Sequence, residues 1–272
     1  MELTNEYGAP DVFLKAVRGH PYSKGDADFS VTGLLQAPQI ARLKKQHWNH
    51  LKSDVRDEVW KLLGTGVHAV LEGHASGVTE MRLFSEYDGV KISGAIDLID
   101  GTHLTDYKVT SVWTTKRDLN PNWEAQLNLY ALLVEQNGGE VESLTIVVVG
   151  RDWVKSRADQ DGYPDSPIVP MPVPLWPFSK REEFVAERVR IHTAENTLPC
   201  TNEDRWARNA YEVVSTPGRN KKFNTIDEAV AHINRQKKGT HTVKDIKPTY
   251  VRCESWCEVA DFCPQWQGEQ GE

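Results

Sequence analysis

Residues 94–110 read GAIDLIDGTHLTDYKVT, two strand-like runs on either side of an Asp-Gly pair. An Asp-Gly pair between such runs is typical of a hairpin turn. Residues two apart on a strand share a face, so the side chains of Asp106 and Lys108 point the same way. A hairpin loop of two or of four residues places Asp97 on that face as well, because only a one-residue slip reverses a strand. This stretch therefore predicts two carboxylates and an amine on one face of a hairpin.

Two neighbouring carboxylates on one face of a sheet repel each other and reduce stability. A divalent cation offsets this repulsion, and Mg²⁺ and Mn²⁺ prefer carboxylate oxygen and water as ligands. A lysine two residues beyond Asp106 can stabilise developing negative charge or orient a metal-bound water. The alternative is a solvent-facing hairpin in which Lys108 forms a surface ion pair, and these three residues alone fit both interpretations.

The segments around this hairpin alternate between helical and strand-like periodicity. They are a helix at 54–73, strands at 80–87, 91–99 and 103–109, a helix at 121–136, a strand at 144–149, a loop at 155–175 and a helix at about 179–196. This order predicts an α/β fold with a central mixed sheet flanked by helices. We expect residues 1–28 to be loosely structured, residues 29–199 to form the core, and residues 200–272 to form a C-terminal lobe.

The chain has 272 residues, of which 39% are hydrophobic, and a net charge of −7. No apolar run approaches the roughly 18 residues of a membrane helix, and the polar N-terminus does not resemble a signal peptide. We therefore expect no membrane partner and a cytoplasmic location. The negative charge argues against a protein that coats nucleic acid nonspecifically, but it is compatible with an enzyme that has a local basic path.

Three further polar residues lie on the helices next to the hairpin. His68 falls on the expected helix at 54–73, and histidine is a common metal ligand. Gln126 and Tyr130 are four residues apart on the helix after the hairpin, so they share a helix face. An ordinary interpretation stays open for each of them, namely a surface histidine, an exposed Gln126 and a partly buried Tyr130.

The ordered motifs GTGVHAVLE, an acidic strand start at Glu80, GAIDLID, DYK and QLNLYALL resemble the RecB-like branch of the PD-(D/E)XK nuclease superfamily. This branch includes the RecB and AddAB nuclease domains and the CRISPR-associated RecB-like exonucleases. The resemblance spans about residues 29–150. It implies a restriction-endonuclease-like core and a metal-dependent deoxyribonuclease that hydrolyses phosphodiester bonds.

The resemblance also implies roles for the residues at matching positions. The expected ligands of Mg²⁺ or Mn²⁺ are His68, Asp97, Asp106 and the backbone carbonyl of Tyr107. The expected catalytic residues are Lys108, Asp97, Asp106, Gln126, Tyr130 and Glu80. Within this set, the QxxxY motif of Gln126 and Tyr130 is expected beside the substrate backbone.

By the same resemblance the substrate is DNA, and an exonuclease that acts on single-stranded or frayed ends is the expected mode. No phosphate-binding G-x4-G-K-[ST] loop occurs in the sequence, so we expect no helicase motor within it. Compact proteins of this kind act in recombination, repair or phage replication, which implies a recombination or replication protein as partner and, for a phage protein, the host cytoplasm. The alternative is a catalytically idle DNA-binding accessory with a nuclease fold.

The four cysteines are Cys200, Cys253, Cys257 and Cys263, and the last three fall within eleven residues. In a cytosolic protein such clustering indicates metal more often than disulfides, although the spacing is irregular for a zinc ribbon. Within the RecB-like branch, three close C-terminal cysteines and one distant cysteine imply a [4Fe–4S] cluster, which needs four thiolates. This chain departs from that pattern in its C-x3-C spacing and in a lone cysteine that follows the core, so Zn²⁺ stays the alternative.

A basic stretch lies in the expected C-terminal lobe. Residues 216–247 carry eight basic and three acidic side chains in a chain of net charge −7. Such segregation suits a surface that tracks phosphates. The candidate nucleic-acid-binding residues are Arg219, Lys221, Lys222, Arg235, Lys237 and Lys238. The alternative is an ordinary solvated helix face followed by a loop.

Overall fold

The computed structural model describes residues 1–19, 23–236 and 238–270. Their contacts divide the chain into two compact units, one made of residues 1–36 and 52–195 and the other of 37–51 and 196–272. This division differs from the expected boundaries, because residues 37–51 group with the C-terminal segment rather than with the core. Among the described residues, every helix lacks the long apolar stretch that spanning a bilayer requires.

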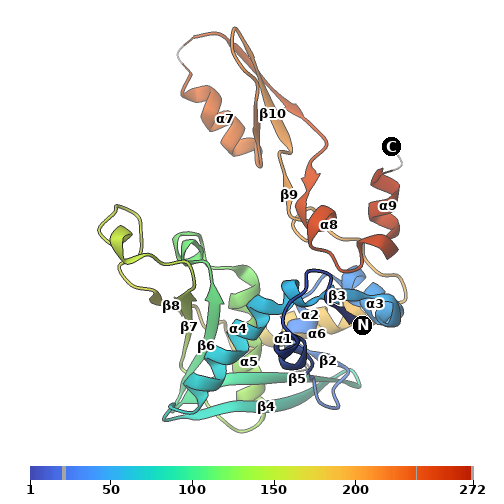
Figure 1. Cartoon of the computed structure of the whole chain (residues 1–272), viewed down its shortest axis with the longest axis vertical. Coiled ribbons are helices and arrows are strands. Elements are labelled where there is room, and N and C mark those ends of the chain that lie inside the picture. Colours follow the sequence, from blue (N-terminus) through green and yellow to red (C-terminus); the bar gives the residue numbers. More distant parts are fainter. Residues whose placement is uncertain (20–22, 237, 271–272) are drawn as a thin grey trace. The chain divides into compact units, whose positions relative to one another are not determined.

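A six-stranded mixed sheet forms the centre of the first unit (Figure 1). Its strands are β2 (Phe29–Ser30), β4 (Val78–Tyr87), β5 (Val90–Asp100), β6 (His103–Thr110), β7 (Ser143–Gly150) and β8 (Ile168–Val173). They follow the order β2-β5-β6-β7-β8, and β4 also pairs with β5. The β2–β5 and β6–β7 pairs are parallel and the other pairs are antiparallel. The predicted mixed sheet is therefore confirmed.

Helices pack around this sheet. They are α1 (Asp11–Gly19), α2 (Val31–Leu34), α4 (Val55–Glu72), α5 (Pro121–Gln136) and α6 (Phe178–Thr193). The Asp54 side chain caps α4 by accepting from the backbone N–H of Arg56, and Asn120 caps α5 in the same way. The side chains of residues 125–134 of α5 are all buried, and this helix contributes seven of the nineteen buried residues in the core of the unit. The α/β class and the helices expected at 54–73 and 121–136 are confirmed.

Two segments differ from expectation. The stretch expected to be loosely structured contains α1 and the strand β1 (Glu2–Thr4), which pairs in parallel with β3 (Lys52–Asp54). The stretch expected to be a loop contains β8, with Pro170 and Pro172 inside the strand. Proline lacks a backbone N–H donor, and an edge strand that pairs on one side tolerates it. The prolines therefore led to the prediction of a loop where the structure has a strand at the sheet edge.

The second unit is built from short elements. They are α3 (Pro38–His47), β9 (Ala207–Arg208), β10 (Tyr211–Thr216), β11 (Lys221–Phe223), α7 (Ile226–Asn234), β12 (Thr240–Asp245), β13 (Thr249–Tyr250), α8 (Val251–Ser255) and α9 (Pro264–Gln270). Strands β11, β10 and β12 form an antiparallel sheet, and β9 pairs with β13. A small core joins Ile40 and Leu43 of α3 to Val259 and Cys263 near the C-terminus. This core explains why α3 groups with the C-terminal segment.

Candidate active site and cysteine pocket

Three side chains of the first unit form a compact group of metal-ligating atoms. His68 of α4, Glu80 of β4 and Asp97 of β5 each place one such atom within 4.8 Å of the others. His68 Nδ1 lies 3.5 Å from Asp97 Oδ1, and His68 Nε2 lies 3.1 Å from the carbonyl oxygen of Tyr107. An imidazole and carboxylates suit Mn²⁺, and carboxylates with water suit Mg²⁺.

Asp97 lies where strands β5 and β6 separate. Their backbone pairing runs from Asp100–His103 to Leu98–Thr105 and then stops. Beyond that point the backbone N–H of Tyr107 donates to Asp97 Oδ2 over 2.8 Å. The hairpin loop is Gly101-Thr102 rather than the expected Asp100-Gly101, and Gly101 takes a φ of +58° that glycine adopts without strain. The side chain of Asp97 thus replaces a backbone bond and is held at the opening between two strands.

Glu80 interrupts the regular geometry of β4. The register places it opposite Asp97, between the pairs Thr79–Leu98 and Met81–Ile96. Its φ is +48°, a left-handed conformation that costs a non-glycine residue on the order of 1–3 kcal/mol. Burial raises the pKa of Glu80, and the nearby carboxylate of Asp97 raises it further. Two directly opposed carboxylates destabilise a strand pair, so this arrangement fits a site that binds a cation.

A second polar cluster lies beside this group, between β6 and α5. Lys108 Nζ lies 2.7 Å from Asp106 Oδ2 and donates to Gln126 Oε1 over 3.0 Å. Gln126 Nε2 donates to Asp106 Oδ1 at 3.3 Å and to the hydroxyl of Tyr130 at 2.9 Å. Gln126 and Tyr130 are both buried. The ordinary interpretation of an exposed Gln126 is therefore wrong, because its buried amide forms hydrogen bonds with both Asp106 and Lys108 of β6.

Asp106 is the most buried acidic residue of the site, with 2% of its surface exposed. Burial raises its pKa to about 6, although the ion pair with Lys108 acts in the opposite direction. Its Oδ2 is close to Lys108 Nζ but lacks a hydrogen bond of normal geometry within the described residues. Asp106 also does not join the compact group of His68, Glu80 and Asp97. A buried carboxylate oxygen with unused acceptor capacity fits a further contact to a cation.

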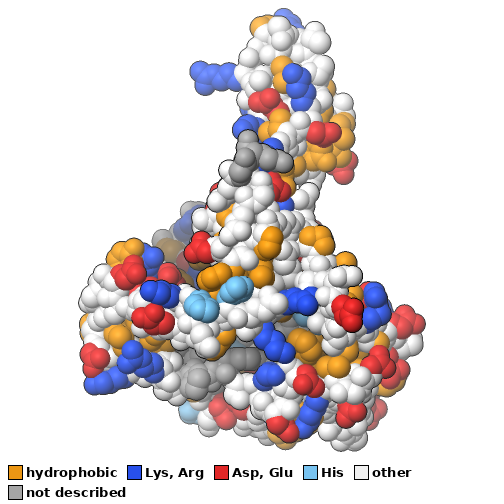
Figure 2. Space-filling view, turned by 90° about the vertical axis from the view of Figure 1, so that its right-hand side faces the viewer, with side chains coloured by type: hydrophobic (Ala, Val, Ile, Leu, Met, Phe, Trp, Pro, Cys, Tyr) orange, Lys and Arg blue, Asp and Glu red, His pale blue; other side chains and the backbone are white. Residues whose placement is uncertain are grey.

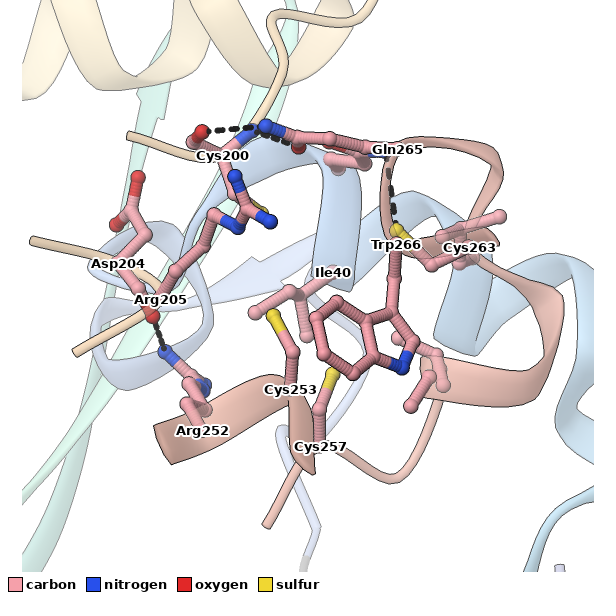
Figure 3. Close-up of a pocket in the computed structure, with 14 residues that line it drawn as sticks. Ile40, Cys200, Asp204, Arg205, Arg252, Cys253, Cys257, Cys263, Gln265 and Trp266 are labelled. Atoms are coloured by element: carbon pink, nitrogen blue, oxygen red, sulfur yellow. Dashed lines mark hydrogen bonds between the residues drawn. The ribbon is translucent and has the colours of Figure 1, made fainter. Parts of the chain in front are cut away.

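All four cysteines line one pocket of the second unit (Figure 3). Burial raises the pKa of the Cys200 thiol to about 12 and also raises the pKa of Cys257. No three cysteine sulfurs within the described ranges lie within 4.8 Å of one another. A tetrahedral zinc site, with Zn–S bonds of about 2.3 Å, would bring its sulfurs to about 3.8 Å. The four thiols therefore share a pocket, but they do not have the spacing of a closed zinc site.

Arg205 is a buried cation in this cysteine pocket, and no local sequence pattern predicts its burial. Only 4% of its surface is exposed. Its guanidinium lies 3.3 Å from the ring centre of Tyr250, and Nη1 donates to Glu269 over 3.0 Å. The Nη2 atom has no hydrogen-bond partner within the described part of the chain. An orphaned buried donor beside four thiols fits an anionic group in the pocket, such as metal-bound thiolates.

The candidate basic residues of the second unit are exposed. Lys221 and Lys222 lie on the edge strand β11, Arg219 precedes it, Arg235 follows α7, and Lys238 lies before β12. Lys237 lies outside the described residues. On the face drawn in Figure 2, basic and acidic side chains are interspersed. The exposed positions are compatible with a nucleic-acid-binding surface and also with a solvated face.

The chain matches the family model of the PD-(D/E)XK nuclease superfamily over residues 31–264. This match covers most of the chain, and the protein belongs to the PD-(D/E)XK nuclease superfamily. Members of the superfamily are typically metal-dependent nucleases, in agreement with the clustered carboxylates and lysine of the site. The predicted core fold is thereby confirmed. Among curated proteins, no relative matches the chain.

Several solved structures are similar to this protein, and they include the following two. SSO0001 has a TM-score of 0.49 and 18% sequence identity, with 72% of this chain and 90% of SSO0001 covered. A "Putative exonuclease" from Eubacterium rectale has a TM-score of 0.33 and 13% identity, with 89% of this chain and 84% of that chain covered. Neither similarity is close enough to carry a residue role to this chain.

Proposed function

We propose that this protein is a RecB-like, metal-dependent DNA nuclease, and that it acts as an exonuclease on single-stranded or frayed ends in recombination, repair or phage replication. The observation that supports it best is the group of His68, Glu80 and Asp97 next to the Asp106–Lys108 pair. Residues 29–199 are proposed as the nuclease core and residues 200–272 as a cysteine-bound lobe.

Each side chain of the site has a proposed role. His68, Glu80, Asp97, Asp106 and the carbonyl of Tyr107 would hold one or two Mg²⁺ or Mn²⁺ ions. When bound by these residues, such an ion would supply a water of lowered pKa and positive charge beside the scissile phosphate. The Nε2 atom of His68 lies 3.1 Å from the carbonyl oxygen of Tyr107 and donates to it, so Nε2 must lose its proton, to Nδ1 or to solvent, before both atoms can act as ligands.

Lys108 is proposed to stabilise the negative charge that develops on the phosphate or to orient the attacking water. Gln126 accepts from its amine and donates to Asp106, so one amide fixes both groups. Tyr130 holds that amide through its hydroxyl. The QxxxY pair is therefore proposed to position the lysine, in addition to lying beside the substrate backbone.

The test is degradation of 5′- and 3′-labelled single- and double-stranded DNA with Mg²⁺ or Mn²⁺. Lys108→Ala and Asp97→Asn should abolish degradation. Asp100→Asn, at the exposed end of the same strand, should leave it unchanged and serves as the matched control. If the metal-loaded wild type binds DNA but degrades none, the idle accessory is the correct function.

For the cysteine pocket we propose a [4Fe–4S] cluster, with Zn²⁺ as the alternative. Each thiolate of such a cluster binds a different iron, so the sulfurs lie farther apart than at a single zinc ion. Sulfurs that do not gather within 4.8 Å of one another in the described residues are compatible with this wider arrangement, and Arg205 would balance part of the negative charge. Protein purified without oxygen should be brown and contain about four irons per chain. Stoichiometric zinc in a colourless protein would establish the alternative.

Arg219, Lys221, Lys222, Arg235, Lys237 and Lys238 are proposed as a phosphate-binding path; all of them except Lys237, which lies outside the described residues, are exposed. Each lost phosphate contact reduces the slope of log affinity against log salt by about 0.7–0.9. The double variant Lys221→Ala and Lys222→Ala should therefore weaken DNA binding and flatten its salt dependence. Lys15→Ala removes an exposed lysine of α1 and is the control. An unchanged salt slope in the double variant would exclude these two lysines from the path.

A further inference from the structure

Trp113 is an exposed ring that its neighbours hold in place. It follows β6 in a short helical turn, Val112–Lys116, and 41% of its surface is exposed. The ring packs edge-to-face on Tyr163 with centroids 5.3 Å apart. Arg157 lies 5.2 Å from the Trp113 ring and 4.8 Å from the Tyr163 ring. Tyr163 is itself buried, and its hydroxyl accepts from the backbone N–H of Val154 at 2.7 Å.

A second exposed indole lies on the helix that supplies His68. Trp60 of α4 is 55% exposed, and the guanidinium of Arg151 lies 4.0 Å from its ring centre. Trp60 precedes His68 by eight residues, about 12 Å along a helix. The backbone N–H of Arg151 donates to the carbonyl of Thr110 over 2.9 Å.

These contacts show how helix α4 is directed relative to strand β6. His68 meets Tyr107, whereas Trp60 meets Arg151 beyond the end of β6. The distance along the chain from Tyr107 to the residue after the end of β6 is about 13 Å at the rise of a strand. This distance agrees with the separation of about 12 Å between Trp60 and His68 along α4. Helix α4 therefore runs antiparallel to β6. The Trp60–Arg151 pair therefore lies near the C-terminal end of β6, beyond Lys108.

Both aromatic groups depend on the same stretch of backbone. Asp152 follows Arg151 and accepts from the backbone N–H of Val112 and from the hydroxyl of Ser111, each at 2.7 Å. This double contact lowers the pKa of Asp152 and fixes the turn that carries Trp113. Arg151 and Asp152 thus connect Trp60 on α4 with Trp113 after β6.

The chemistry of the two groups fits nucleobases better than phosphates. Residues 111–118 and 151–167 together carry five basic side chains (Lys116, Arg117, Arg151, Lys155, Arg157) and five acidic ones (Asp118, Asp152, Asp159, Asp161, Asp165), so their net charge is zero. Indole rings flanked by guanidinium groups stack on bases, and each stacked base contributes about 1–3 kcal/mol of binding. Bases offer their faces only where they are unpaired.

We propose that Trp60, Arg151, Trp113 and Arg157 form a stacking platform for the unpaired bases of a single strand that leads to the site of Lys108. The proposal deepens the proposed nuclease function and rests on it for the location of the scissile bond. Tyr163 supports the platform from below, and its buried ring does not contact bases. Selection of unpaired strands would then come from stacking, in addition to the phosphate path of the second unit.

The test measures binding rather than cleavage, in the full chain with Lys108→Ala and without divalent metal. Fluorescence anisotropy is recorded with labelled oligothymidylate, with an abasic oligonucleotide of equal length, and with a blunt duplex. Trp60→Ala and Trp113→Ala should each weaken oligothymidylate binding about tenfold, the effect of about 1.4 kcal/mol of lost stacking. Binding of the abasic strand and the duplex should change less than twofold.

Two controls separate stacking from folding. Trp113→Phe keeps a flat ring and should retain most of the affinity. Trp48→Ala removes an exposed tryptophan of the second unit that also has a lysine beside its ring, and should leave all three affinities unchanged.

Several results would overturn the platform: no binding of oligothymidylate by the parent protein, unchanged binding in both alanine variants, or equal losses with the abasic strand. A catalytically inert wild type that shows the expected binding pattern would instead refute only the nuclease function.

Discussion

The buried carboxylate of Asp106 lowers the stability of the protein at neutral pH and is at the same time a proposed metal ligand. Its pKa is raised to about 6 mainly because burial disfavours the ionised form. An acid with a raised pKa in the folded state stabilises the fold below its unfolded pKa of about 4 and loses that contribution as the pH rises to about 6. At neutral pH the ionised group therefore destabilises the metal-free protein.

Asp106→Asn should consequently raise the free energy of unfolding at pH 7.5 while it abolishes nuclease activity. We expect a gain on the order of 1 kcal/mol, because loss of the Lys108 ion pair offsets part of the relief. The gain should disappear below about pH 3, where Asp106 is protonated in both states. Denaturant unfolding of metal-free protein at the two pH values checks this. A variant that is less stable at pH 7.5 would contradict the assignment of burial as the dominant cause.

The raised pKa of His68 places metal binding under the control of pH. Its hydrogen bond to Asp97 favours the protonated ring, which cannot bind metal. Mn²⁺ affinity should therefore fall up to about tenfold for each unit of pH below that pKa. The electron spin resonance signal of free Mn²⁺ measures this affinity. His68→Gln should bind more weakly with a shallower pH dependence, whereas a flat pH profile of the wild type from 5 to 8 would exclude His68 as a ligand.

At this scale the sequence indicated candidate residues that lie together in the structure, but it did not predict how they are arranged. The motifs around Asp97, Asp106, Lys108 and Gln126 place these side chains in one region of the structure. The opposition of Glu80 and Asp97 depends on the β4–β5 register, which no local pattern fixes. Arg205 was missed because an arginine between surface-like residues gives no sign of burial.

Among the elements, β5 and α5 approach each other closely beside the site. A Cβ atom on Gly94 would lie 2.8 Å from the ring of Tyr130 and from the side chain of Leu133. The absence of a side chain at Gly94 lets α5 approach the sheet, and this approach brings Gln126 and Tyr130 to Asp106 and Lys108.

Gly94→Ala should therefore destabilise the protein by about 1–3 kcal/mol through overpacking and should lower activity by displacing α5. Thermal unfolding and the nuclease assay measure both effects. Gly64→Ala in α4 is the matched control, since a Cβ there meets nothing within 4 Å. It should stabilise the helix by up to about 1 kcal/mol. Equal stability changes in the two variants would contradict the close-packing argument.

Long elements with clear periodicity were predictable, and short or irregular ones were not. Helix α5 and strand β7 have long apolar runs that tertiary contacts reinforce. Strand β8 alternates proline with apolar residues, so its propensity opposes the structure that pairing with β7 imposes. The short strands of the second unit are held by contacts between distant segments, which local periodicity does not record.

For the whole molecule, the proposed metal site of His68, Glu80 and Asp97 links catalysis to stability. A ligand that binds only the folded state stabilises it by about 2.7 kcal/mol at a hundredfold excess over its Kd. Since opposed carboxylates repel until a cation is bound, the melting temperature should rise on addition of Mn²⁺ or Mg²⁺. Asp97→Asn should remove most of this rise, and Asp100→Asn should retain it. Calorimetry with and without chelator measures the difference, and equal rises in both variants would place the metal elsewhere.

The grouping of residues 37–51 with 196–272 has a consequence for biosynthesis. As the chain leaves the ribosome, Ile40 and Leu43 of α3 emerge long before Val259 and Cys263, the residues that cover them. Throughout translation of residues 52–195 this apolar face has no native partner, and nascent chains are exposed to misassociation or need a chaperone. Expression of residues 1–195 alone would make that state permanent, so a soluble nuclease fragment should omit or replace the apolar residues of α3.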